Sequence, residues 1–145
     1  MTTDTDPYDT YYVAALNAAE GSGIQHCAYF DANWQRIWPQ ATLVSKTAVR
    51  IEQALPDDPN LPDDLSSAID RNATLGGGIF RFLDDASPVP RWLESSDPKR
   101  KGKGRFVQVP VAGTTLGAIL MFSVPGSTAS LRATTDPQIK IGSPG

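Results

Sequence analysis

The chain has little of several features that would point to a particular class of protein. Cys27 is its one cysteine, so no disulfide can form within the chain. Acidic residues outnumber basic ones by 16 to 13, which argues against general nucleic-acid binding because phosphate contacts need clustered Lys and Arg. No apolar run is long enough to cross a bilayer, and the acidic start of the chain does not read as a signal peptide. We expect a cytoplasmic protein with no membrane segment and no nucleic-acid partner.

The composition that is present fits one folded domain. Apolar residues make up 40% of the 145 residues and charged residues 20%, a balance that excludes wholesale disorder. A chain of this length can bury enough surface to fold without disulfides or metal. We expect a disordered N-terminus over 1–7, a single domain over 8–124 and a flexible tail over 125–145. The tail is rich in Pro, Gly and Ser, and its few apolar residues are too sparse to build another layer.

Apolar spacing of three and four residues predicts three helices. The first is an amphipathic lead-in helix over 7–20, with Gly21 placed to end it. The second carries Val44, Ala48, Ile51 and Leu55 on one face and ends at Pro56. The third is weaker and runs from Pro62 to about Asn72.

Other segments have the composition of β-strands. A turn at Asp31-Ala32-Asn33 separates two β-prone runs and predicts a hairpin. The run 116–124 is almost continuously apolar, which predicts a central strand covered on both faces. The predicted strands are 24–30, 34–38, 79–83, 91–94, 105–112 and 116–124. Helices and strands are segregated along the chain, which favours an α+β fold with an antiparallel sheet.

The segments in this order resemble a PAS-type sensory domain over residues 24–124. The run 28–38 looks like the opening PAS hairpin, two short helices follow it, and the closing strands are similar to the end of PAS and of the related GAF domains. The resemblance implies an antiparallel five-stranded sheet with short helices on one face and a lead-in helix before it. Roadblock and profilin-like folds share a similar order of elements and remain alternatives.

A PAS-like pocket would take its lining from one face of the sheet and from the helices. The predicted ligand-binding residues are His26, Ala28, Ile51, Phe80, Phe82, Ile119 and Met121. Ile24 and Ile69 would complete the same lining. No cofactor is implied.

The sequence contains no recognisable set of catalytic or metal-binding residues. His26 and Cys27 are adjacent on a predicted strand, so their side chains point to opposite faces and cannot act on each other. Structural zinc sites rarely complete one His and one Cys with carboxylates, and the acidic stretch 57–64 lacks the spacing of a calcium loop. We expect a protein that is not an enzyme and holds no metal.

A basic segment stands out in this acidic chain. Five positive charges fall within seven residues: Lys99, Arg100, Lys101, Lys103 and Arg105. Such a loop can bind phosphates or other anions, a nucleic-acid backbone or an acidic partner surface, or can simply be solvated.

Two functional hypotheses follow from the sequence. The first is a standalone PAS-like regulatory module in signal transduction, which binds a small-molecule ligand or a protein partner, or forms a homodimer. The alternative is a non-catalytic interaction or assembly protein, such as a scaffold subunit or a virus-encoded component. It would act through the basic loop 99–105 and the C-terminal tail. Aromatic residues dominate interface hot spots, so part of the aromatic set in the first 38 residues could bury against a partner. This set is Tyr8, Tyr11, Tyr12, Tyr29, Phe30, Trp34 and Trp38.

Overall fold

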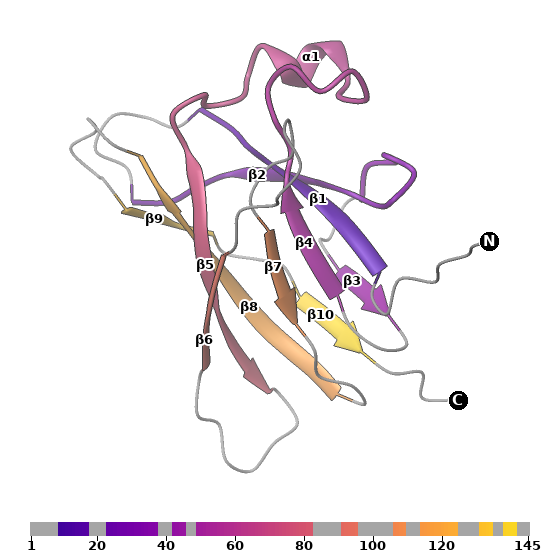
Figure 1. The fold of residues 1–145 in the computed structure, drawn as a ribbon, viewed down its shortest axis with the longest axis vertical. Helices are drawn as coiled ribbons and strands as arrows, with labels where there is room; N and C mark the ends of the chain where they lie inside the picture. Colours follow the sequence, from indigo (N-terminus) through magenta and orange to yellow (C-terminus); the bar gives the residue numbers. More distant parts are fainter. Residues whose placement is uncertain are drawn as a thin grey trace.

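The computed structural model describes residues 9–17, 23–37, 42–45, 49–82, 91–95, 106–109, 114–124, 131–134 and 138–141. Over these ranges the chain forms ten β-strands and one four-residue helix (Figure 1). The elements in chain order are β1 (Asp9–Ala15), β2 (Cys27–Phe30), β3 (Thr42–Ser45), β4 (Val49–Gln53), α1 (Asp63–Ser66), β5 (Thr74–Phe82), β6 (Arg91–Glu94), β7 (Phe106–Val109), β8 (Thr114–Ser123), β9 (Leu131–Ala133) and β10 (Gln138–Ile141).

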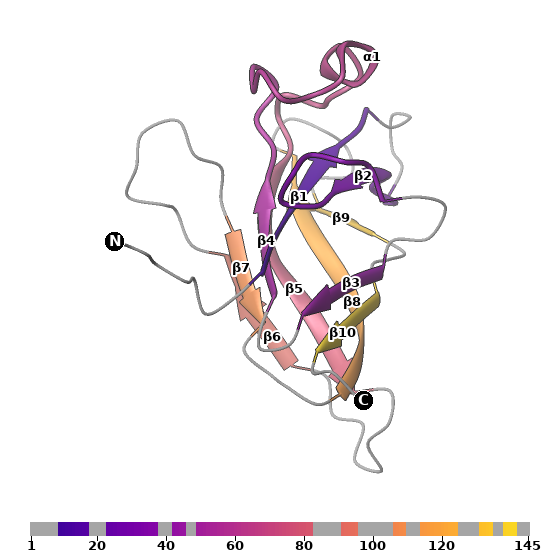
Figure 2. The same cartoon turned by 90° about the vertical axis from the view of Figure 1, so that its right-hand side faces the viewer.

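The strands form two sheets that pack face to face. One sheet has four strands in the order β2-β1-β4-β7, and the other has six, in the order β3-β10-β8-β5-β6 with β9 paired to β8. Strand β8 is long enough to hold β5 along one edge and both β10 and β9 along the other. Figure 2 shows β1, β2 and β4 in one layer and β5 and β8 in the layer behind it. The fold is a two-layer β-sandwich.

The main core lies between the two sheets. Alternate residues of β1 point inward, among them Tyr11 and Val13, because successive side chains of a strand point to opposite faces. Leu120 and Phe122 of β8 meet them from the six-stranded sheet and are fully buried. Burial of this kind, at about 25 cal/mol per Å² of apolar surface, is the main force that holds the sheets together.

A second apolar cluster covers part of the outer face of the four-stranded sheet. Leu61, Leu65 and Ile69, from the segment around α1, pack with Ala14 of β1 and Phe30 of β2. The segment that carries α1 rises from the end of β4 and returns into β5 (Figure 1). The chain therefore buries this outer face over β1 and β2 with its own residues.

The expected α+β class with helices over the sheet is wrong. Within the predicted lead-in helix over 7–20, residues Asp9–Ala15 form strand β1, which pairs with β2 and β4. Both faces of β1 are apolar, since Tyr11 faces the main core while Ala14 faces the second cluster. Apolar residues on both faces mask the two-residue alternation, and the same letters then fit a helical spacing.

The two later helices are corrected in the same way. The predicted helix through Val44 and Ile51 is the pair of strands β3 and β4, and Val49 and Ile51 alternate inward on β4. The helix predicted from Pro62 to Asn72 is reduced to α1, which spans Asp63–Ser66. Four residues form a single turn, and its Leu65 serves to cover the sheet rather than to build a helical layer.

The predicted five-stranded antiparallel sheet is also wrong. Strand β1 pairs in parallel with β4, and β3 pairs in parallel with β10. Two segments of the stretch that was expected to be a tail are strands β9 and β10, which extend the six-stranded sheet along β8. Pairing along one edge of β8 therefore forms strands from residues whose composition alone does not indicate a strand.

Several local predictions are confirmed. Strands occupy 91–94, most of 79–83 and 116–124, and half of 105–112, and β8 lies in the interior of its sheet. The expectation that 116–124 is covered on both faces is wrong, because Ile119 is exposed on the outer face. The turn after β2 is stabilised by Asp31, whose Oδ1 accepts hydrogen bonds from the backbone N–H of Asn33 at 2.9 Å and of Gln35 at 3.0 Å. The return run is limited to a bridge between Phe30 and Arg36.

Candidate functional site

Three large apolar side chains form a row across the outer face of the six-stranded sheet. Ile79 of β5 lies opposite Trp92 of β6 and, on its other side, opposite Ile119 of β8. Residues paired directly across strands project to the same face of a sheet. The neighbouring Leu120 is buried in the main core, so Ile119 and its two partners face outward.

A second row continues the same face toward β9. Met121 is two residues beyond Ile119 and pairs with Ala133 of β9, which in turn bridges to Ile24. Leu131 is two residues before Ala133 and pairs with Ser123. The two-residue period of strands places these side chains on the face of Ile119. We call the set Ile24, Ile79, Trp92, Ile119, Met121 and Leu131 the outer apolar face.

The outer apolar face holds every large hydrophobic side chain that the described part of the chain exposes. The exposed fractions are 47% for Ile24, 36% for Ile79, 50% for Trp92, 41% for Ile119 and 62% for Leu131. A large side chain buries on the order of 200 Å², so the five leave roughly 500 Å² of apolar surface in water. Single exposed hydrophobic residues are normal, whereas a contiguous patch of this size is comparable to the largest that a typical monomer exposes, and such patches are often functional.

The backbone of β5 is irregular beside this row. The pairing with β8 shifts between Leu75 and Gly77, which leaves Gly76 as a bulge. Gly77 has φ 154°, a region that side-chain-bearing residues rarely adopt. Gly77 also pairs with Glu94, which is exposed at the edge strand β6. The bulge sets where the outer row of β5 begins, and Glu94 supplies a charge at the margin of the face.

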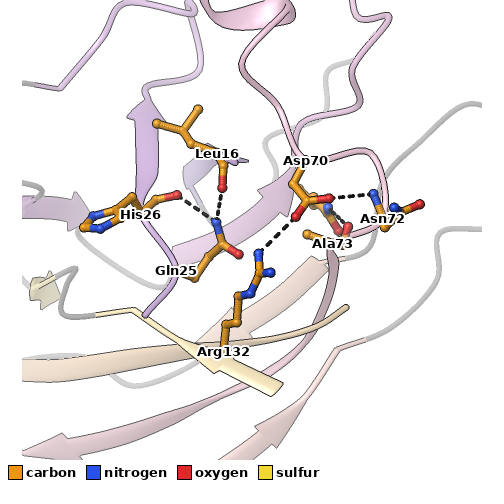
Figure 3. Close-up of polar contacts among 8 residues, drawn as sticks. Leu16, Gln25, His26, Asp70, Asn72, Ala73 and Arg132 are labelled. Carbon is orange, nitrogen blue, oxygen red and sulfur yellow. Dashed lines mark hydrogen bonds and ion pairs between the residues drawn. The ribbon is translucent and has the colours of Figure 1, made fainter. Parts of the chain in front are cut away.

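A buried polar cluster lies beside β9 and includes Gln25 and Arg132, the sequence neighbours of Ile24 and Leu131 (Figure 3). Arg132 of β9 pairs with Asp70 at 3.0 Å, and both side chains are largely buried. The amide Nε2 of Gln25 donates to the carbonyl oxygens of Leu16 at 2.7 Å and of His26 at 2.9 Å. The ion pair ties β9 to the loop after α1, and the bond from Gln25 to Leu16 ties the segment before β2 to the end of β1. The backbone N–H of Gln25 also donates to the carbonyl oxygen of Ala133 in β9 at 2.9 Å. Each contact joins elements of the fold, so we assign the cluster a structural role.

A third cluster lies on the outer face of the four-stranded sheet. The rings of Tyr12 and Trp34 stack at 4.1 Å, and Arg50 lies 3.7 Å from the centroid of the Phe106 ring. Burial raises the pKa of Tyr12 above its ordinary value of 10.0, with Glu52 and Asp58 adding to the rise and Arg50 opposing it. The phenol therefore stays protonated at neutral pH and acts as a packing group with a polar end.

The structure distributes the predicted ligand-binding residues over several places. Ile119 and Met121 belong to the outer apolar face, Ile51 is buried between the sheets, and Ala28 is buried under the α1 segment. His26 is exposed, beside the half-buried Cys27. The backbones of Phe80 and Phe82 lie on β5, and their side chains are outside the described set. Among the predicted residues whose side chains are described, Ile24, Ile119 and Met121 share the outer apolar face, and Ala28 and Ile69 share the second apolar cluster.

The remaining predictions concern charge, metal and membrane. The basic residues Lys99, Arg100, Lys101, Lys103 and Arg105 lie outside the described residues. Within the described ranges no group of three or more His, Cys, Asp or Glu side chains is placed to hold a metal ion. In those same ranges no helix has the length and apolarity to cross a membrane.

Comparisons with protein-family models and with curated proteins give no match for this chain. The candidate site therefore depends on its own geometry. Sequence reasoning missed Ile79, Trp92 and Leu131 as members of one surface. Alternation in 91–94 and 79–82 carried part of the signal, but only the register between β5, β6 and β8 brings the residues together.

Proposed function

We propose that this chain is a non-catalytic interaction or assembly protein that binds a protein partner through the outer apolar face. The observation that carries the proposal is the grouping of all five exposed large hydrophobic residues of the described chain on one side of the sandwich. Water-exposed apolar surface of this extent is costly, and burial against a partner recovers about 25 cal/mol per Å². A role in binding therefore accounts for the exposure of these residues.

The contrast between the two outer faces supports the proposal. The chain covers the outer face of the four-stranded sheet over β1 and β2 with Leu61, Leu65 and Ile69. On the six-stranded sheet, Trp92 and Ile119 stay half exposed. Among residues of that face with described side chains, Glu94 is the only charged one. Few charged side chains and an aromatic anchor are typical of the centre of a protein interface.

The sensory hypothesis receives less support from this architecture. It required several helices packed over a sheet to enclose a ligand, and in the described part of the chain the one four-residue helix α1 lies in a segment that fills its contact with β1 and β2 by apolar packing. The interaction hypothesis needs no enclosed pocket. The sequence placed the interaction surface at the basic loop 99–105 and the C-terminal tail. We propose instead that it lies at the outer apolar face.

Site-specific photo-crosslinking tests the proposal. A photoreactive phenylalanine analogue at position 119 in the full chain, irradiated in the cells that express it, should give a covalent adduct with protein. The same analogue at the exposed Arg71, in the loop after α1, is the matched control and should give none. The adduct at position 119 should be lost when Trp92→Ser is added. Absence of any protein adduct from position 119 would contradict the proposal.

A further inference from the structure

We infer that the outer apolar face is a homodimer interface, and that its occupant is the same face of a second copy of this chain. This inference rests on the proposed function and names the partner. It is carried by the size of the face, by the apolar character of its described side chains and by the shape of an extended sheet.

The size of the face fits one half of a stable dimer interface. A standard interface buries about 800 Å² on each partner, and the apolar share is roughly 65% in homodimers. Each copy should therefore contribute on the order of 500 Å² of apolar surface, which is the amount that the five exposed residues leave in water.

The geometry of the sheet allows two copies to pack face to face. Sheets pack about 10 Å apart with side chains of both faces interdigitating. A two-fold axis along the strands would set the β6 edge of one copy over the β9 edge of the other. Trp92 would then lie over the region of Ile24 and Leu131 of the second copy, and the two Glu94 carboxylates would lie at opposite margins. This arrangement pairs apolar with apolar surface and separates the like charges.

Sedimentation equilibrium of the purified full chain tests the inference. Between about 1 μM and 1 mM the native chain should pass from monomer to dimer, where the monomer has a mass of 15.6 kDa. Ile119→Ser should raise the dissociation constant at least tenfold, since each substitution acts twice in a two-fold interface and central apolar residues contribute more than about 1 kcal/mol each. Arg71→Ser is the matched surface control and should leave the dissociation constant unchanged.

Circular dichroism of Ile119→Ser should match the native spectrum, which shows that loss of the dimer is not loss of the fold. If that variant does not fold, Trp92→Ser on the edge strand β6 provides the same comparison. A native chain that stays monomeric over the whole range would overturn the inference, and so would a dimer that neither folded variant weakens.

The two proposals fail in different ways. A monomeric purified chain whose position 119 still crosslinks to another protein would refute the homodimer and leave the interaction surface in place. A monomeric chain with no adduct at position 119 would refute both.

Discussion

Ile119 and Leu120 are consecutive residues of β8, yet Ile119 is 41% exposed on the outer apolar face and Leu120 is fully buried between the sheets. This relationship follows from the alternation of side chains along a strand. It separates the two tasks of β8. One side of the strand holds the sandwich together, and the other is available for a partner.

Alanine at each of these two positions should have opposite consequences. Leu120→Ala should lower the free energy of unfolding by about 3 kcal/mol, because it leaves a cavity in a packed core. Ile119→Ala should change it by less than about 0.5 kcal/mol, because the side chain is exposed in the monomer. Urea unfolding at low protein concentration measures both. Equal losses at the two positions would show that Ile119 is part of the core.

The ion pair between Arg132 and Asp70 predicts that removal of the arginine alone destabilises the folded protein. Arg132→Met should lower the free energy of unfolding by about 3 kcal/mol, because it leaves the Asp70 carboxylate buried without its cation. Adding Asp70→Asn should recover much of the loss, since the amide carries no charge and can still accept the hydrogen bond from the Asn72 N–H. Arg71→Met, at an exposed neighbour, is the control for loss of a positive charge. If Arg132→Met is as stable as Arg71→Met, the ion pair has no stabilising role.

The glycines of β5 should differ in their tolerance of a side chain. Gly77→Ala should be destabilising by about 1–3 kcal/mol, because φ at this position is 154°. Gly76→Ala is the matched control, since an added Cβ would meet the Met121 carbonyl oxygen at 3.6 Å, an ordinary contact distance. Thermal unfolding measures the stability of both variants. A Gly77→Ala protein that unfolds at the same temperature as the native protein would contradict the expected strain.

Tyr12 predicts a loss of stability in alkaline solution. Burial, Glu52 and Asp58 raise its folded-state pKa above 10.0, so the folded protein holds the phenolic proton more tightly than the unfolded chain does. The free energy of unfolding should therefore fall as pH rises from about 10 through the higher folded-state pKa. Tyr12→Phe removes this contribution, and its stability should fall less over the same pH range. Parallel pH profiles for the two proteins would show that Tyr12 does not contribute.

The parts of the fold that could be predicted are those where one face of a strand is buried and the turn chemistry is local. Asp31 and the runs in β6 and β8 are of this kind, because their own residues carry the signal. Strand β1 could not be recognised, because the main core and the α1 segment bury its two faces and erase the alternation. Strands β9 and β10 exist through pairing with the distant β8, which no local pattern encodes.

The residues of the candidate site could not be grouped from the sequence for the same reason. Ile119 and Met121 were predicted to line a PAS-like ligand pocket, and the structure places both on the outer apolar face. Trp92 and Ile79 join them only through strand register, and Leu131 only through the pairing of β9. Long-range pairing therefore assembles a surface from residues that are unremarkable one at a time.

Oxidative footprinting of tryptophan in the cells that express the full chain tests the central claim most directly. Trp92 lies on the outer apolar face, and Trp34 lies on the opposite sheet, stacked on Tyr12, so one chain carries both the probe and its control. Trp92 should be oxidised more slowly in cells than in the dilute purified protein, while the rate at Trp34 stays the same. Equal oxidation of Trp92 under the two conditions would mean that no partner covers this face.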